Sequence, residues 1–222
     1  MLGIGSGVTK RGGRPNPIES EGKQSAGGVS GHSTEVVENP LSGERITIVC
    51  RNVGPEANAL VWDLVLGPGG RVPSSHIHPR QQECFTVLDG ELHFRVGWRR
   101  LEVRQGESVT VAPGRVHSFA NQGRVPIRVR VETVPALDME DLLRTAAVLA
   151  QDQYLAGKRL PRLVDLVLFM QEFKAEVASP WIPGVVVIIC RPAAYLARLI
   201  HADRRYRRLR QSCGSPTVGH QA

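Results

Sequence analysis

The chain has 222 residues, of which 41% are hydrophobic and 22% are charged, a composition typical of a soluble globular protein rather than a disordered or membrane-embedded one. Its net charge is +7, but residues 191–222 hold seven arginines, no lysine and one acid, so they carry +6 and residues 1–190 carry only +1. The basic character is therefore local, and it gives no electrostatic reason to expect that the main body binds nucleic acid.

The first 33 residues include nine glycines among serines, prolines and scattered charges. Such a stretch cannot bury enough apolar surface to offset the entropy of ordering, so we expect residues 1–33 to be a disordered tail. The GIGSG sequence at residues 3–7 has a faint likeness to a phosphate-binding loop, but no strand pattern precedes it and no helix pattern follows it.

Neither end of the chain carries a pattern typical of membrane insertion. The N-terminal region has no apolar run of seven or more residues, and the apolar run at 184–190 is cut by Arg191 and Pro192, whereas a spanning helix needs roughly 20 apolar residues.

The cysteines show no CxxC spacing, so free thiols in a reducing cytoplasm are expected. The four are Cys50, Cys84, Cys190 and Cys213.

Short runs rich in Val, Ile and Thr, separated by Gly, Asn and Asp turns, fill residues 34–136. This pattern predicts an antiparallel sandwich or barrel. The expected strands are TEVVE, RITIVC, ALVWDLVL, ECFTVL, ELHFRV, RRLEVR, SVTVAP and IRVRVETV. Asp89-Gly90 is a favoured two-residue turn, and we expect a hairpin of the two strands that flank it.

The pattern changes to helical spacing over residues 137–210. One helix is predicted between a possible N-cap at Asp138 and a possible C-cap at Gly157, and a second begins near Pro161. A third segment from about Gly184 to Arg210 is interrupted at Pro192. We therefore expect a β-barrel, then about three helices, and a disordered tail at 211–222.

Two histidines one residue apart, His76 and His78, precede Glu83 by a few residues. In an extended segment residues i and i+2 lie on one face, so the two imidazoles form a pair of nitrogen donors. Alternation along the next strand places Glu83 on the same face as Phe85 and Val87. A carboxylate in such surroundings is costly to bury unless it is paired or bound to a metal.

His117 follows a Pro-Gly turn and supplies a fourth donor. Three neutral imidazoles and one carboxylate form a mixed nitrogen and oxygen site that suits iron, manganese, nickel, copper or zinc. We therefore predict one divalent transition metal bound by four residues. They are His76, His78, Glu83 and His117.

These residues stand in a pattern that resembles the two sequence motifs of the cupin family. The first motif comprises Gly70, His76, His78, Glu83 and Gly90, and the second comprises Gly106, Gly114, His117 and Asn121. One departure is Ala112, where the family usually has proline, which this chain has at Pro113. The resemblance covers roughly residues 38–135 and is more specific for fold and metal binding than for reaction.

The resemblance implies a small antiparallel jelly-roll barrel and a likeness to quercetin dioxygenase-type proteins. It favours a metal-dependent oxidoreductase that binds a small organic substrate inside the barrel, with Glu83 as a catalytic proton acceptor, and a homodimer. Two alternatives stay open: a non-catalytic module that binds or senses a small ligand, and a redox-neutral isomerase or lyase.

Several other side chains have weaker patterns. His93 is interpreted as an ordinary strand histidine or as a neighbour of the site, and Arg95 and Gln82 as surface residues or contacts to an acidic substrate. Four aromatic residues are interpreted as barrel lining, namely Trp62, Phe85, Phe94 and Phe119.

The arginine cluster at residues 204–210 fits a solvated helix end, where the helix dipole favours cations. Contact with an anionic membrane surface or a partner is an alternative, and nucleic acid is the least favoured.

Overall fold

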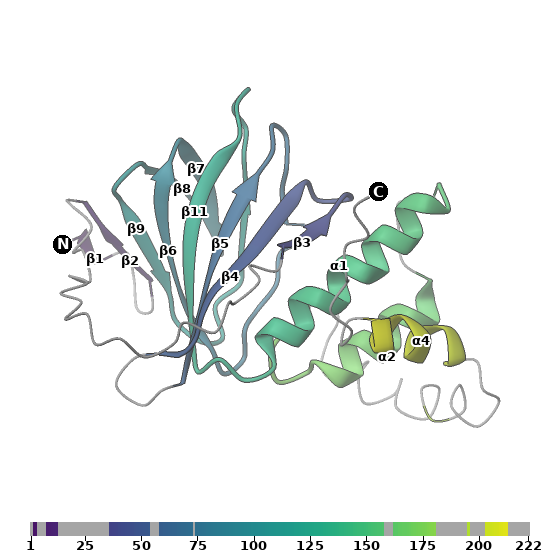
Figure 1. Cartoon of the computed structure of the whole chain (residues 1–222). Coiled ribbons are helices and arrows are strands. Elements are labelled where there is room, and N and C mark those ends of the chain that lie inside the picture. Colours follow the sequence, from purple (N-terminus) through teal and green to yellow (C-terminus); the bar gives the residue numbers. More distant parts are fainter. Residues whose placement is uncertain are drawn as a thin grey trace, which may run out of the picture.

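The computed structural model of the chain describes residues 2–3, 8–12, 36–53, 58–72, 74–157, 162–180, 195 and 203–212. In these residues the strands form two antiparallel sheets that pack face to face (Figure 1). The larger sheet has the order β1-β2-β9-β6-β11-β5-β4-β3, and the smaller has the order β10-β7-β8. The strands are β1 (Leu2–Gly3), β2 (Val8–Arg11), β3 (Val36–Asn39), β4 (Glu44–Val53), β5 (Ala59–Leu66), β6 (Gln82–Asp89), β7 (Glu91–Val96), β8 (Arg99–Arg104), β9 (Ser108–Val111), β10 (His117–Ala120) and β11 (Ile127–Val134).

Alternation of apolar and polar residues along these strands builds the core. On β11 every second residue from Ile127 to Thr133 is buried, and the residues between them are exposed. Phe85 of the larger sheet contacts Phe94 and Phe119 of the smaller sheet, with ring centroids 5.0 and 5.5 Å apart. The predicted fold class, a mainly β antiparallel jelly roll followed by helices, is confirmed.

Several predicted strands match the structure residue for residue. The runs ALVWDLVL, ELHFRV, RRLEVR and IRVRVETV are β5, β7, β8 and β11. The prediction omitted β10, because its four residues HSFA follow a turn directly and show too little alternation to stand out.

The hairpin predicted at Asp89-Gly90 is wrong. The strand β6 pairs with β9 and β11, whereas β7 pairs with β10 and β8, so the chain passes from one sheet to the other at this turn. Both edges of β6 are already occupied, which leaves no edge for β7. Gly90 has φ +85°, and a Cβ atom there would lie 2.6 Å from Cγ2 of Ile127, so the crossing requires glycine.

Part of the stretch expected to be disordered forms strands. Residues 8–11 are β2, which pairs with β9 from Val8↔Val111 to Arg11↔Ser108 and extends the larger sheet. The Val8 side chain is buried, and composition alone could not reveal this pairing. Residues 13–35 lie outside the described residues, as do the GIGSG stretch beyond Gly3, His32, Cys190, Cys213 and residues 213–222.

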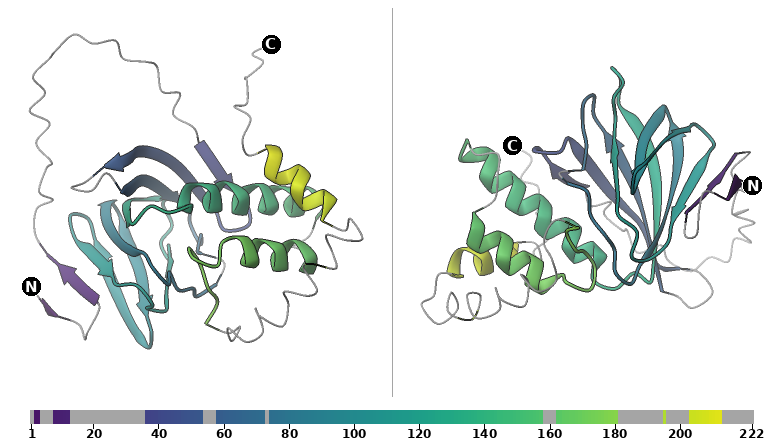
Figure 2. Two further views of the ribbon diagram at one scale, coloured as in Figure 1. Left: turned by 90° about the horizontal axis from the view of Figure 1, so that it is seen from below. Right: turned by 180° about the vertical axis from the view of Figure 1, so that it is seen from behind.

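Three helices are described after the barrel: α1 (Met139–Leu155), α2 (Leu163–Glu172) and α4 (Arg204–Ser212). Asp138 is the N-cap residue of α1, although its side chain makes no capping hydrogen bond, and Gly157 has φ +66° just after the helix. The helix α1 lies beside β3, and the three helices pack together on that side of the barrel (Figures 1 and 2). The expected kink at Pro192 lies outside the described residues.

Two of the five arginines of α4 bind acidic residues of the other helices. Arg205 pairs with Asp152 and Asp165, and Arg210 pairs with Asp141 and Glu172. These ion pairs hold α4 against α1 and α2, whereas Arg204, Arg207 and Arg208 are exposed, and Arg207 pairs with Asp203. In the part of the chain that the structure describes, no helix combines the length and the apolar character needed to cross a membrane.

Candidate metal centre

The four predicted ligands come from three places in the fold. His76 and His78 lie on the extended segment between β5 and β6, Glu83 is the second residue of β6, and His117 begins β10. The backbones of His76 and His117 bind each other in both directions, with N–H···O distances of 3.0 and 2.9 Å. This pairing places the first motif directly beside the second.

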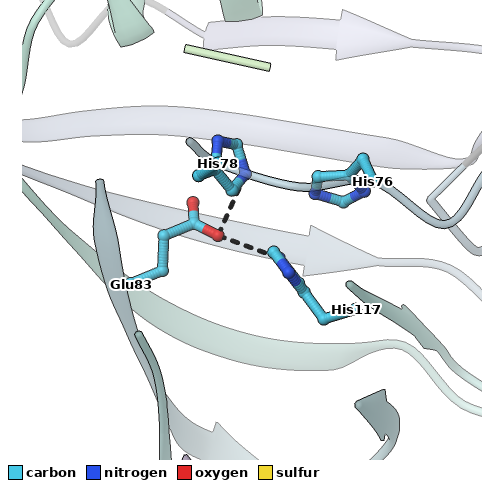
Figure 3. A group of neighbouring side chains, drawn as sticks. All are labelled: His76, His78, Glu83 and His117. Carbon is cyan, nitrogen blue, oxygen red and sulfur yellow. Dashed lines mark hydrogen bonds and ion pairs between the residues drawn. The ribbon is translucent and has the colours of Figure 1, made fainter. Parts of the chain in front are cut away.

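The side chains of these residues converge inside the barrel (Figure 3). The Oε2 atom of Glu83 lies 3.2 Å from Nε2 of His78 and 3.1 Å from Nε2 of His117. One nitrogen or oxygen atom from each of the four residues lies within 4.8 Å of the others. Bonds of about 2.0–2.2 Å to one metal would separate neighbouring ligand atoms by about 3.0–3.4 Å, so the donor set fits a single ion.

Backbone carbonyl groups hold the outer nitrogen of every imidazole. The Nδ1 atoms of His76, His78 and His117 lie 3.1, 2.5 and 3.0 Å from the carbonyl oxygens of Ser74, Glu176 and Arg115. A carbonyl oxygen can only accept, so each Nδ1 carries the proton. In the neutral rings each Nε2 then has a free lone pair, which is the tautomer that a metal requires.

The carboxylate of Glu83 is oriented from its other side by a buried hydroxyl group. Thr133 Oγ1 donates to Glu83 Oε1 at 3.5 Å, and Trp62 Nε1 donates to Thr133 Oγ1 at 3.3 Å. Trp62, Thr133 and Glu83 are all buried. This arrangement fixes the plane of the carboxylate and directs Oε2 toward the histidines.

The electrostatics of the cluster keep Glu83 ionised and His76 neutral. Burial favours a higher pKa for Glu83, but the charge of His78 and the hydrogen bond with His117 outweigh it, so this pKa lies well below its usual range. Burial lowers the pKa of His76 to about 3, and His117 and His78 add to the effect. For His78, Glu83 and the Glu176 carbonyl outweigh burial and raise the pKa.

Aromatic side chains surround the cluster. The rings of Phe94 and His117 stack with an interplanar angle of 3° and centroids 5.9 Å apart, and Phe85 lies 6.1 Å from His117. His78, Glu83 and His117 are buried, whereas His76 is half-buried. The least enclosed side of the centre is therefore the side of His76.

The substitution of the usual proline by Ala112 leaves the second motif intact. Arg115 N–H donates to the Ala112 carbonyl, and Gly114, with φ +77°, donates to the carbonyl of His78 at 2.8 Å. The turn therefore still presents His117 to the centre.

Two residues that sequence reasoning missed support the centre. Glu176 contributes only its backbone carbonyl, which leaves no signal in the sequence. Gln81 is buried, and its Nε2 donates to the carbonyls of Pro135 and Ala136 at 3.1 and 2.9 Å. It anchors the segment just before Glu83, and only its position beside the motif could have indicated it.

The remaining candidates lie away from the centre. The His93 side chain lies on the outer face of the small sheet, opposite the metal centre, where it forms a second cluster with Glu91 and Glu102. Arg104 donates to both of these carboxylates, so each of them already binds a cationic side chain. Arg95 and Gln82 are exposed, and Cys84 points to the opposite face of β6 from Glu83; Cys50 and Cys84 are free thiols.

Comparison with known proteins agrees with this geometry. Residues 62–134 match the family model of the cupin domain, and these residues carry both motifs and most of the barrel. The barrel of this chain therefore has the jelly-roll fold of the cupin domain. No curated protein matches the sequence.

Two solved structures illustrate the likeness. A double-stranded β-helix protein from Klebsiella pneumoniae shares 24% identity with a TM-score of 0.39, over 46% of this chain and 84% of that one. An RmlC-like cupin from Shewanella frigidimarina shares 20% identity with a TM-score of 0.42, over 53% of this chain and 97% of that one. The likeness to the cupin domain rests on the family model and on the fold of the barrel, and not on these two TM-scores.

Proposed function

We propose that this protein is a metal-dependent cupin oxidoreductase of the dioxygenase kind, acting on a small organic substrate inside the barrel. One divalent transition metal, of the set iron, manganese, nickel, copper and zinc, is held by His76, His78, Glu83 and His117. The observation that carries the proposal is the convergence of one nitrogen from each of three imidazoles and one carboxylate oxygen, with every Nδ1 bound to a carbonyl.

The chemistry divides between the ion and the side chains. A bound transition metal would supply Lewis acidity and redox capacity at this point. If the bound ion were six-coordinate, four protein ligands would leave two positions for other molecules. Phe85, Phe94 and Phe119 line the adjoining barrel and limit the access of water.

Glu83 has a second role in the proposal as the proton acceptor for a substrate hydroxyl group. Its carboxylate has an oxygen on each side: Oε1 accepts from Thr133, while Oε2 lies between two imidazoles. A base held in this way transfers a proton without reorienting.

The proposal also covers the oligomeric state of the protein and the boundaries of its domains. We expect a cytoplasmic homodimer whose cupin barrel covers residues 34–136 and is followed by a helical region at 137–210. Light scattering of the full chain tests the assembly.

Metal content measured by ICP-MS on untagged protein tests the centre. Wild type is expected to hold about one equivalent of a transition metal, and His76→Ala/His78→Ala to lose it. His93→Ala is the matched control, because it removes a histidine from the same barrel without touching the centre, and it should retain the metal. A wild type that lacks metal and takes up none when it is added would overturn the proposal.

Oxygen consumption with a panel of phenolic and enolic substrates then separates the functional classes. Turnover with oxygen uptake supports the dioxygenase. Binding without turnover favours the ligand-binding module, and turnover without oxygen uptake favours the isomerase or lyase.

A further inference from the structure

The outer face of the small sheet carries a row of three polar side chains and one alanine. The short bridge Arg71↔Ala120 adds residue 71 beside β10, and the pairs Ala120↔His93 and His93↔Glu102 continue the row across β7 and β8. Because directly opposite residues share a face, these side chains all point away from the core.

A parallel row lies two residues along each strand. It consists of Ser118, Arg95 and Arg100, which are paired in that order. The residues between the two rows, Phe94 and Phe119, are buried in the barrel. The polar face and the metal centre therefore lie on opposite sides of the same sheet.

This face is hollowed into a groove of about 880 Å³. Its wall includes Lys10 of β2 and residues Ser74 and Ser75, in addition to the two rows. Small-molecule sites in proteins have volumes of about 300–1,000 Å³, so the groove is large enough for a metabolite-sized ligand.

The charge of the groove is strongly positive. Five basic residues line it against a single acid, Glu102. Lys10 pairs with Glu107, and Arg104 pairs with Glu91 and Glu102.

Three guanidinium groups are left without a carboxylate partner among the described residues: Arg71, Arg95 and Arg100. Within the described part of the chain, one of these three guanidinium groups makes a hydrogen bond, from Arg95 Nε to the Gly97 carbonyl at 3.1 Å. A guanidinium group presents its donors in a fork that matches a carboxylate or a phosphate.

We propose that this groove binds a small anionic ligand that carries two or more carboxylate or phosphate groups. Arg71 and Arg100 bind its acidic groups, and the hydroxyl groups of Ser74, Ser75 and Ser118 supply neutral hydrogen bonds. The groove adjoins the metal centre at Ser74, whose carbonyl accepts from Nδ1 of His76, but its arginines lie on the opposite face of the small sheet. The proposal does not depend on the function proposed for the metal centre.

Isothermal titration of the full chain with inorganic phosphate and, separately, with succinate tests the proposal. Both probes bind metals weakly, and the titration is repeated after dialysis against EDTA to exclude the metal centre. We expect saturable binding of at least one probe with a Kd near or below about 1 mM, unchanged by EDTA. Preference for phosphate or for succinate identifies the acidic group.

The double variant Arg71→Gln/Arg100→Gln should weaken binding at least tenfold. Arg128→Gln is the matched control: it removes an exposed strand arginine of the larger sheet that has no described carboxylate partner, and its affinity should stay within twofold of wild type.

Three results would overturn the proposal. They are the absence of saturable binding of both probes, equal affinities of wild type and the double variant, and an equal loss in Arg128→Gln, which would indicate a general effect of net charge. If the first of these results is accompanied by tight binding of a single-stranded oligonucleotide, the arginines belong to a nucleic-acid surface instead. Amide shifts in two-dimensional NMR should concentrate on β7, β8 and residue 71.

Discussion

The backbone carbonyl of Glu176 accepts a hydrogen bond from Nδ1 of His78 at 2.5 Å, although the two residues lie 98 positions apart. Next to this contact, Ile77 and Ala178 bind each other through both backbone groups at 2.9 and 2.8 Å. Residues 176–178 lie outside the matched cupin range of 62–134. The segment after α2 thus orients one of the four donors of the candidate metal centre.

Ala178→Pro should weaken metal binding because it removes the N–H that donates to the Ile77 carbonyl. The carbonyl of Glu176 then loses its position beside His78. Loss of a group that orients a ligand typically lowers metal affinity about 10- to 100-fold, and we expect a loss in this range. Competition with a chromophoric chelator measures it.

Ala178→Gly is the control for this variant, because glycine keeps the backbone N–H. Its metal affinity should stay close to that of wild type, while circular dichroism verifies that both variants are folded. Equal affinity of Ala178→Pro and wild type would show that the segment does not support the centre.

The four candidate ligands could be predicted because their information is local. The spacing of His76, His78 and Glu83 places three donors on two adjacent extended segments, and His117 completes a known pair of motifs. The contribution of Glu176 could not be predicted, because every residue has a backbone carbonyl and any of them could supply the same acceptor there. This contact depends on where the segment after α2 packs against the barrel.

The strands could also be predicted, because alternation is a local pattern, but the pairing of strands into sheets could not. Alternation along residues 127–134 identifies β11 without any knowledge of its neighbours. Which strands pair is decided by contacts distant in sequence, so the local sequence at Asp89-Gly90 predicts a hairpin turn although this turn joins two sheets. The ordered strand β2 was missed because its stability comes from β9 and not from its own composition.

Gly90→Ala tests the crossing between the sheets. Alanine at φ +85° is strained, and its Cβ would lie 2.6 Å from Cγ2 and 3.2 Å from Cβ of Ile127, a buried residue. We expect the free energy of unfolding to fall by at least about 3 kcal/mol, as strain and overpacking combine. Urea denaturation followed by tryptophan fluorescence measures the change.

Gly97→Ala separates the two contributions. Gly97 also has a positive φ, +56°, but nothing lies within 4 Å of the position that an alanine Cβ would take there, so only backbone strain of about 1–2 kcal/mol is expected. Equal losses in Gly90→Ala and Gly97→Ala would contradict the close approach to Ile127.

Glu44 should make the stability of the protein depend on pH. Burial raises the pKa of this carboxyl group from 4.5 to about 7, although a hydrogen bond from Ser42 opposes the rise. The folded state therefore binds the proton more tightly than the unfolded state. Its contribution to stability is fully present below pH 4.5 and is lost as the pH rises through 7, by up to about 3 kcal/mol.

Urea denaturation at pH 5 and pH 8 of wild type and Glu44→Gln measures this contribution. The amide cannot ionise, so the variant should lose less stability than wild type between the two pH values. Glu132→Gln, which changes an exposed carboxylate of β11, should follow the wild-type dependence. An identical pH dependence in wild type and Glu44→Gln would show that Glu44 does not cause it.

Arg205 should be the residue that holds α4 in place. It pairs with Asp152 and with Asp165, and the Asp165 side chain is only 3% exposed. Removal of one partner from a buried ion pair leaves an uncompensated charge and typically costs about 3–5 kcal/mol.

In Arg205→Ala we therefore expect α4 to detach locally, with faster hydrogen exchange in α4 and the facing part of α1 while the barrel strands keep their protection. Arg208→Ala removes an exposed arginine of the same helix and should leave exchange unchanged, so equal exchange in the two variants would assign the docking of α4 to its apolar contacts instead.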